Sequence, residues 1–119
     1  MVNVLVVEDT PFFYETYIDI LNFRGHNAKG AINGKQGLDI LALDDTINII
    51  FTDYYMPFIN GYDFSKIVKT DQKYIKYFSI PIIGIGDFPF DKREFLVDCK
   101  TKTSLKLTDF YDWIEQYCI

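Results

Sequence analysis

Four short apolar runs, separated by segments long enough to form helices, constrain the fold of this chain most strongly. The runs cover residues 4–7, 48–52, 82–85 and 97–101. Continuous apolar runs of this length are typical of parallel strands that are buried on both faces, and the segments between them suit crossover helices. The pattern therefore predicts an α/β fold built on a doubly wound parallel sheet.

The segments between these runs complete the predicted element order. A helix is expected from Pro11, with Thr10 as its N-cap, and residues 26–32 form a weak second strand. The apolar spacing over residues 105–117 predicts an amphipathic final helix. Together the elements amount to five strands and about five helices, which predicts a flavodoxin-like sheet of strand order 2-1-3-4-5.

The fourth connection is unusually short. Only residues 86–96 separate the fourth and fifth strands, which is near the lower limit for a crossover that contains a helix. Pro89 shortens the available stretch further. We therefore expect the helix of this connection to be shortened or absent.

Composition bounds the class of protein. A chain of 119 residues that is 49% hydrophobic predicts one folded domain over residues 1–119. No apolar run reaches the length of a membrane span or a secretory signal, which favours a cytoplasmic protein without membrane contact. The net charge of −5 argues against nucleic acid as a partner. Cys99 and Cys118 lack metal-ligand spacing, and a reducing compartment disfavours a disulfide between them.

Charged residues follow the predicted strands at the edge where such sheets bind ligands. Glu8 and Asp9 end the first apolar run, Asp53 ends the third strand, and Lys102 follows the fifth. Converging carboxylates repel one another, and Mg²⁺ would offset that repulsion through Asp9, Asp53, a backbone carbonyl and waters. A carboxylate beside a metal and a lysine suits nucleophilic phosphoryl transfer, which would give an aspartyl phosphate.

Several motifs carry a resemblance to a known family. Residues 4–10 (VLVVEDT), 49–64 (IIFTDYYMPFINGYDF) and 80–85 (IPIIGI), together with Lys102, resemble the receiver domains of two-component response regulators. The most specific part is the Asp-x-x-Met-Pro-x-x-x-Gly spacing that begins at Asp53. The resemblance covers nearly the whole chain.

The resemblance implies a role for each site residue. Asp53 would be the phosphoacceptor, and Lys102 would pair with the phosphoryl group. Asp9 would be a direct Mg²⁺ ligand, Glu8 a water-mediated one, and Tyr55 the donor of a backbone carbonyl to the metal.

The same resemblance implies a signalling module in a phosphorelay, not an enzyme. Its expected partners are a histidine kinase or phosphotransfer domain and a downstream protein that the sequence does not name; a homodimer stays open. Because no output segment follows Ile119, we expect either a stand-alone receiver or a piece of a larger regulator. Met1, directly ahead of the first strand, favours a natural start.

Three departures from the family pattern favour an alternative function. Gly86 stands where receivers usually carry Ser or Thr, Cys99 replaces the aromatic residue of the fifth strand, and Thr103 replaces a proline. The alternative is a pseudo-receiver that acts as an interaction module independently of phosphorylation. A flavin or nucleotide carrier fits less well, because the first loop is acidic where a phosphate would need backbone donors.

Some further expectations concern side chains around the site. Tyr55 and Phe88 would flank the phosphoryl group and slow its hydrolysis. Phe12 belongs to an apolar outer side of the first helix that would be either a docking surface or a packed rim. The third helix carries lysines expected to form one solvated face: Lys66, Lys69, Lys73 and Lys76.

Overall fold

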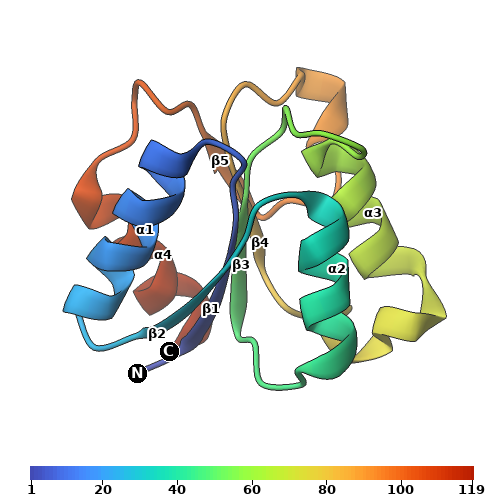
Figure 1. Cartoon of the computed structure of the whole chain (residues 1–119), viewed down its shortest axis with the longest axis horizontal. Helices are drawn as coiled ribbons and strands as arrows, with labels where there is room; N and C mark the ends of the chain where they lie inside the picture. The colour runs from blue at the N-terminus through green and yellow to red at the C-terminus, as the bar shows by residue number, and fades with distance from the viewer.

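The computed structural model describes residues 1–119 as a five-stranded parallel sheet with helices on both faces (Figure 1). The strand order β2-β1-β3-β4-β5 confirms the predicted doubly wound topology. The strands are β1 (Asn3–Val7), β2 (Asn27–Ala31), β3 (Ile49–Thr52), β4 (Ile82–Ile85) and β5 (Asp98–Lys100). The helices are α1 (Pro11–Phe23), α2 (Gly34–Leu43), α3 (Gly61–Thr70), α4 (Leu107–Cys118) and the 3₁₀-helices η1 (Gln72–Tyr77) and η2 (Phe90–Lys92).

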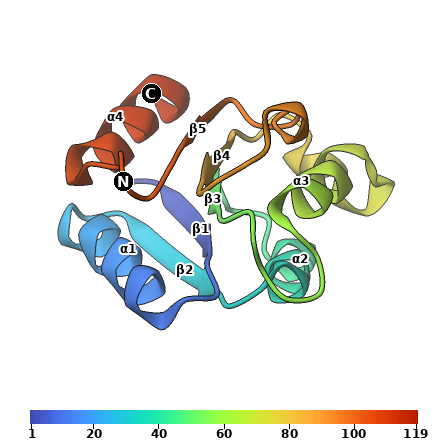
Figure 2. The ribbon, with the colours of Figure 1, turned by 90° about the horizontal axis from the view of Figure 1, so that it is seen from above.

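Alternating strand residues build two cores, one on each face of the sheet. Seen from above, α1 and α4 cover one face and α2 and α3 cover the other (Figure 2). Val6 and Phe51 point into the first core, where they meet aromatic residues such as Phe110. Val7 and Ile50 point into the second core. Burial on both faces explains why these strands are continuously apolar.

The parallel register brings the carboxyl ends of the strands to one edge of the sheet. Val7 of β1 lies opposite Thr52 of β3, and the next amide, Asp53 N–H, donates to the carbonyl of Val7 at 3.0 Å. Across the sheet, Gly86 N–H donates to the carbonyl of Lys100 at 2.9 Å. The residues that follow β1, β3, β4 and β5 are thereby collected around one site.

The connection between β4 and β5 contains no α-helix, as its length predicted. Only the single turn of η2 forms, and the guanidinium of Arg93 donates to the carbonyl of Phe88 at 3.1 and 2.8 Å. The expectation of about five helices is therefore corrected to four α-helices and two 3₁₀-helices.

The final helix begins later than the sequence predicts. Its apolar spacing extended to residue 105, but α4 starts at Leu107, whose side chain is exposed. Asp109 sets this start, because its carboxylate accepts from the Lys106 N–H at 2.7 Å and from the Lys100 ammonium at 2.9 Å. No helix of the structure is both long and apolar enough to cross a membrane.

The prediction that four lysines form one solvated face is wrong for Lys69. Lys66 lies exposed on α3, and Lys73 and Lys76 are exposed on η1. Lys69 instead folds back, and its half-buried ammonium donates to three backbone carbonyls. The carbonyls belong to Tyr77, Phe78 and Ile80. Burial lowers the pKa of Lys69 to about 8.

Candidate functional site

The three predicted acids converge where β1 and β3 end. Oxygens of Glu8, Asp9 and Asp53 all lie within 4.8 Å of one another. Glu8 and Asp53 are buried beneath the edge of the sheet, with Glu8 only 1% exposed. Asp9, one residue further along the loop, lies nearer to solvent. The strand order accounts for this meeting, because β1 and β3 are neighbours at the point where the order reverses.

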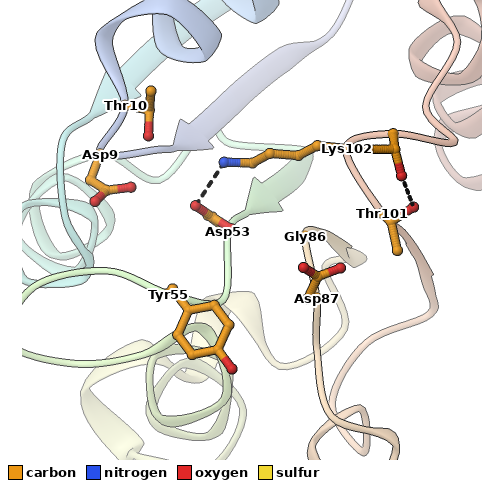
Figure 3. A pocket seen from close by; sticks show the side chains of 9 residues that line it. Asp9, Thr10, Asp53, Tyr55, Gly86, Asp87, Thr101 and Lys102 are labelled. Atoms are coloured by element: carbon orange, nitrogen blue, oxygen red, sulfur yellow. Dashed lines mark hydrogen bonds and ion pairs between the residues drawn. The ribbon is translucent and has the colours of Figure 1, made fainter.

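Lys102 reaches into this cluster from the loop after β5. Its ammonium lies 2.9 Å from Glu8 Oε1 and 3.0 Å from Asp53 Oδ2, so one cation bridges two buried carboxylates (Figure 3 shows the contact with Asp53). The remaining oxygens are held by backbone amides, Asp53 Oδ1 by Tyr54 N–H at 2.8 Å and Glu8 Oε2 by Thr10 N–H at 3.0 Å. Direct contacts through Lys102 thus hold Glu8 and Asp53 together.

Burial and charge act in opposite directions on this bridge. Burial raises the pKa of Glu8 to about 7, although its bonds to Lys102 and Thr10 favour the ionised form. Burial alone would lower the pKa of Lys102, but its close contacts with the carboxylates of Glu8 and Asp53 outweigh burial and raise that pKa. Lys102 therefore stays charged and is the principal counter-charge of the cluster.

A cleft of about 320 Å³ opens above the bridge. Asp9 and Asp53 face it from one side, Gly86 and Asp87 from another, and Lys102 from the third (Figure 3). Threonines 10, 101 and 103 and Tyr55 complete the lining. The cleft gives a small anionic group direct access to both the Asp53 carboxylate and the Lys102 ammonium.

Two glycines permit this geometry. A Cβ on Gly86 would collide with Asp53 Oδ1, and its φ of +148° suits glycine rather than other residues. A Cβ on Gly61, the last residue of the Asp53 motif, would collide with the Asp53 carbonyl oxygen. The glycine at 86 therefore does more than remove a hydroxyl: its backbone lies against the candidate phosphoacceptor.

The expectation that Phe88 flanks the phosphoryl group is wrong. Its ring is 2% exposed, points into the protein and packs on Tyr54 at 5.0 Å between ring centroids, because the turn at Gly86 directs the chain inward. Tyr55 lines the cleft, but its ring points away from Asp53 (Figure 3). No bulky aromatic side chain covers Asp53 from the Gly86 side.

Some features of the site could not be seen in the sequence. The direct pair between Glu8 and Lys102 and the packing of Lys102 over the ring of Phe13, at 4.4 Å from its centroid, are contacts between residues far apart in the chain. Asp87 was visible after the fourth strand, and its position at a strand end was the signal for its place in the lining.

Comparisons with known proteins agree with this geometry. Residues 4–87 match the family model described as response regulator receiver domain. The two-component response regulator ORR11 of Oryza sativa subsp. indica is 31% identical over 81 residues, which are 68% of this chain and 53% of that protein. ORR7 of subsp. japonica is 27% identical over 86 residues, which are 72% of this chain and 40% of that protein. The chain spans about half the length of the curated relatives it matches.

Solved structures share the fold over its full length. A response regulator receiver protein from Pseudomonas putida superposes with a TM-score of 0.84 at 23% identity, covering 97% of this chain and 96% of that one. The response regulator TrrA from Thermotoga maritima, solved in complex with Mg²⁺ and BeF, gives a TM-score of 0.83 at 19% identity, covering 98% and 99%. These superpositions confirm the flavodoxin-like architecture.

Proposed function

Because this chain belongs to the response regulator receiver domain family, a family of signalling modules rather than enzymes, we propose that Asp53 accepts a phosphoryl group from a phosphohistidine donor. The donor would be a histidine kinase or a phosphotransfer domain, and the signal would pass on through contacts with a downstream protein. The observation that carries the proposal is the Lys102 ammonium, which bridges Glu8 and Asp53 beneath an open cleft.

The contacts of Asp53 prepare it as a nucleophile. Tyr54 N–H holds Oδ1 and Lys102 holds Oδ2, so the carboxylate cannot rotate freely. A carboxylate oxygen would attack phosphorus while the P–N bond of the donor breaks, and the electron pair of that bond would go to the imidazole, which takes up a proton. Lys102, whose partner Asp53 is then no longer a free carboxylate, would pair with a phosphoryl oxygen and compensate the negative charge of the phosphoryl group.

The acidic cluster fits a Mg²⁺ ion. The ion prefers a few oxygen ligands and keeps several waters, and three carboxylates within 4.8 Å supply suitable oxygens. Asp9, Asp53 and the backbone carbonyl of Tyr55 would hold it directly. Glu8 is 1% exposed and, unlike Asp9 and Asp53, does not line the cleft, which supports a water-mediated role for Glu8. Bound Mg²⁺ would supply positive charge to the transferred phosphoryl group.

One observation favours the pseudo-receiver as the second candidate. No hydroxyl stands at Gly86, and Cys99 offers only a thiol, 3.9 Å from the Gly86 carbonyl, where an aromatic side chain would be needed to follow a phosphoryl group. In that case the domain would bind its partner in one fixed conformation. The two candidates differ in whether Asp53 is ever modified.

Intact mass after incubation with Mg²⁺ and a small phosphodonor separates the two functions. We expect the wild type to gain one phosphoryl group from acetyl phosphate or from phosphoramidate, a donor with a P–N bond. Asp53→Asn should gain none, while the matched control Asp87→Asn, which removes an acid lining the same cleft, should still be modified. No adduct on the wild type with either donor would leave the pseudo-receiver as the function.

A further inference from the structure

The ammonium of Lys102 has a third neighbour besides its two carboxylates. Glu8 and Asp53 take two of its directions at 2.9 and 3.0 Å, and the ring of Phe13 covers another, with Nζ 4.4 Å from the ring centroid. The Lys102 side chain is only 22% exposed. An ammonium at this distance from an aromatic face is attracted by the negative charge density of the ring, most strongly where water is partly excluded.

Phe13 is a firm platform for this contact. It lies in the first turn of α1, two residues after the rigid Pro11, and its ring stacks on Tyr17 at 5.8 Å. Tyr17 in turn packs on Phe110 of α4 at 5.1 Å, so the row of rings is anchored in the core. The position of the Phe13 ring is therefore fixed by close packing rather than by Lys102.

The Phe13 ring also contacts a side chain that is exposed on the surface of the protein. Phe12, the preceding residue of α1, packs edge-on against Phe13 at 5.3 Å between ring centroids and is 69% exposed. A shift of the Phe13 ring would therefore change the position of an exposed aromatic side chain. The route from Asp53 through Lys102 and Phe13 to Phe12 consists of three direct contacts.

We propose that Phe13 is a positioning residue for Lys102 and that its ring couples the state of Asp53 to Phe12 on the outer side of α1. The positioning contact exists in the free protein. The coupling rests on the proposed function, because it requires Lys102 to change its contacts when a phosphoryl group arrives on Asp53. With Gly86 and Cys99 unable to follow that group, α1 becomes the element that responds.

The contact is tested first in the free protein by NMR. The side-chain methylene and ammonium protons of Lys102 should be shifted upfield by the ring current of Phe13. Phe13→Leu, which keeps an apolar side chain but removes the ring, should abolish the shift, and Phe13→Tyr should preserve it. Phe23→Leu is the matched control, since Phe23 lies at the far end of the same helix and is exposed.

The coupling is tested by titration with beryllofluoride in the presence of Mg²⁺. Phe13→Leu should weaken beryllofluoride binding by about three- to ten-fold, because a Lys102 side chain without the ring must be ordered when the ligand binds, while Phe13→Tyr restores the affinity. The ring resonances of Phe12 should move on binding in the wild type and stay still in Phe13→Leu. Phe23→Leu should bind as the wild type does.

The possible failures are distinguishable. If the wild type does not bind beryllofluoride, the proposed function fails, while the ring-current shift still decides the positioning contact. If the wild type binds but Phe13→Leu binds equally well and Phe12 still responds, the inference is overturned and the proposed function stands. Should Phe13→Leu not fold, the absence of the upfield shift in the wild type would by itself overturn the inference.

Discussion

At the scale of single residues, the lack of a side chain at Gly86 is what allows the backbone to lie against Asp53. The backbone of Gly86 approaches Asp53 so closely that any Cβ would collide with the carboxylate. Restoring the hydroxyl that receivers usually carry would therefore not restore their switch. A serine or threonine at position 86 would supply the hydroxyl, but its Cβ would also displace the Asp53 carboxylate.

Gly86→Ser should destabilise the protein by about 2–3 kcal/mol, since it combines backbone strain with a steric clash. The modification of Asp53 should become slower at the same time. Gly25→Ser is the matched control, because Gly25 also has a positive φ, +84°, but open space around it, so it should cost only about 1 kcal/mol. Urea denaturation measures the stability of both variants. A Gly86→Ser variant that is as stable as the wild type would contradict the steric argument.

At the level of helices and strands, the connection between β4 and β5 differs most from the pattern that the sequence resembles. It holds one turn, η2, and is tied down by the Arg93 guanidinium on the Phe88 carbonyl. The segment has no helix to move as a unit, and the residues that would drive such a movement are Gly86 and Cys99. Phosphorylation of Asp53 would therefore have little effect on this connection.

Beryllofluoride should shift amide resonances near Asp53 and Lys102 and in the first turn of α1 but barely perturb residues 90–99. Chemical-shift mapping of the free and beryllofluoride-bound protein measures this, with Mg²⁺ alone as the control. Large, cooperative shifts through residues 90–99 would show that the chain switches by the usual route after all.

The junction between α2 and β3 carries a separate pH-dependent contact. The Lys29 ammonium, followed by the hydroxyl and amide of Thr46, holds the pKa of Asp44 at about 2. A carboxyl whose folded pKa lies below its ordinary value stabilises the protein above that ordinary value, and the contribution is lost as the pH falls toward 2.

Asp44→Asn should therefore remove most of this acid sensitivity. Because Lys29 is half-exposed and solvent screens the pair, we expect the wild type to lose only about 1 kcal/mol more than the variant between about pH 4 and pH 2. Asp45→Asn, at the neighbouring exposed position, is the control. Equal slopes of unfolding free energy against pH in wild type and Asp44→Asn would disprove the assignment.

At the scale of the whole molecule, part of the negative charge is concentrated where β1 and β3 end. Three carboxylates meet at the end of the sheet, and Lys102 compensates them only in part. A ligand that binds the folded state and not the unfolded one stabilises the protein in proportion to its concentration over Kd. Mg²⁺ binding should therefore be visible as a property of the whole fold.

Mg²⁺ at ten to thirty times its Kd should raise the melting temperature by about 3–10 °C. Asp9→Ala should abolish this dependence, and Asp39→Ala, an exposed acid on α2, should leave it intact. Differential scanning calorimetry in EDTA and in Mg²⁺ makes the comparison. A melting temperature of the wild type that does not respond to Mg²⁺ would count against the metal site.

The sequence predicted the sheet and the acidic cluster well for one physical reason. Strands buried on both faces must be continuously apolar, so β1, β3 and β4 were visible, and their order places Glu8, Asp9 and Asp53 together. The short fourth connection followed from chain length alone. These inferences need only local composition and topology.

The errors concern where single side chains point. Phe88 was expected in the cleft and lies in the core, and Lys69 was expected in solvent and caps three carbonyls. The platform of Phe13 under Lys102 joins residues at opposite ends of the chain. Rotamers and long-range packing decide such contacts, and neither is encoded in the spacing of nearby residues.

The inward turn of Phe88 has a consequence for how long a signal would last. With that ring in the core and Tyr55 turned aside, no aromatic side chain would shield an acyl phosphate on Asp53 from water in the cleft. We therefore expect the acyl phosphate to hydrolyse faster than one that an aromatic side chain covers. A short-lived phosphorylated state would make the output of the domain follow the recent activity of the phosphodonor and end soon after that donor becomes inactive.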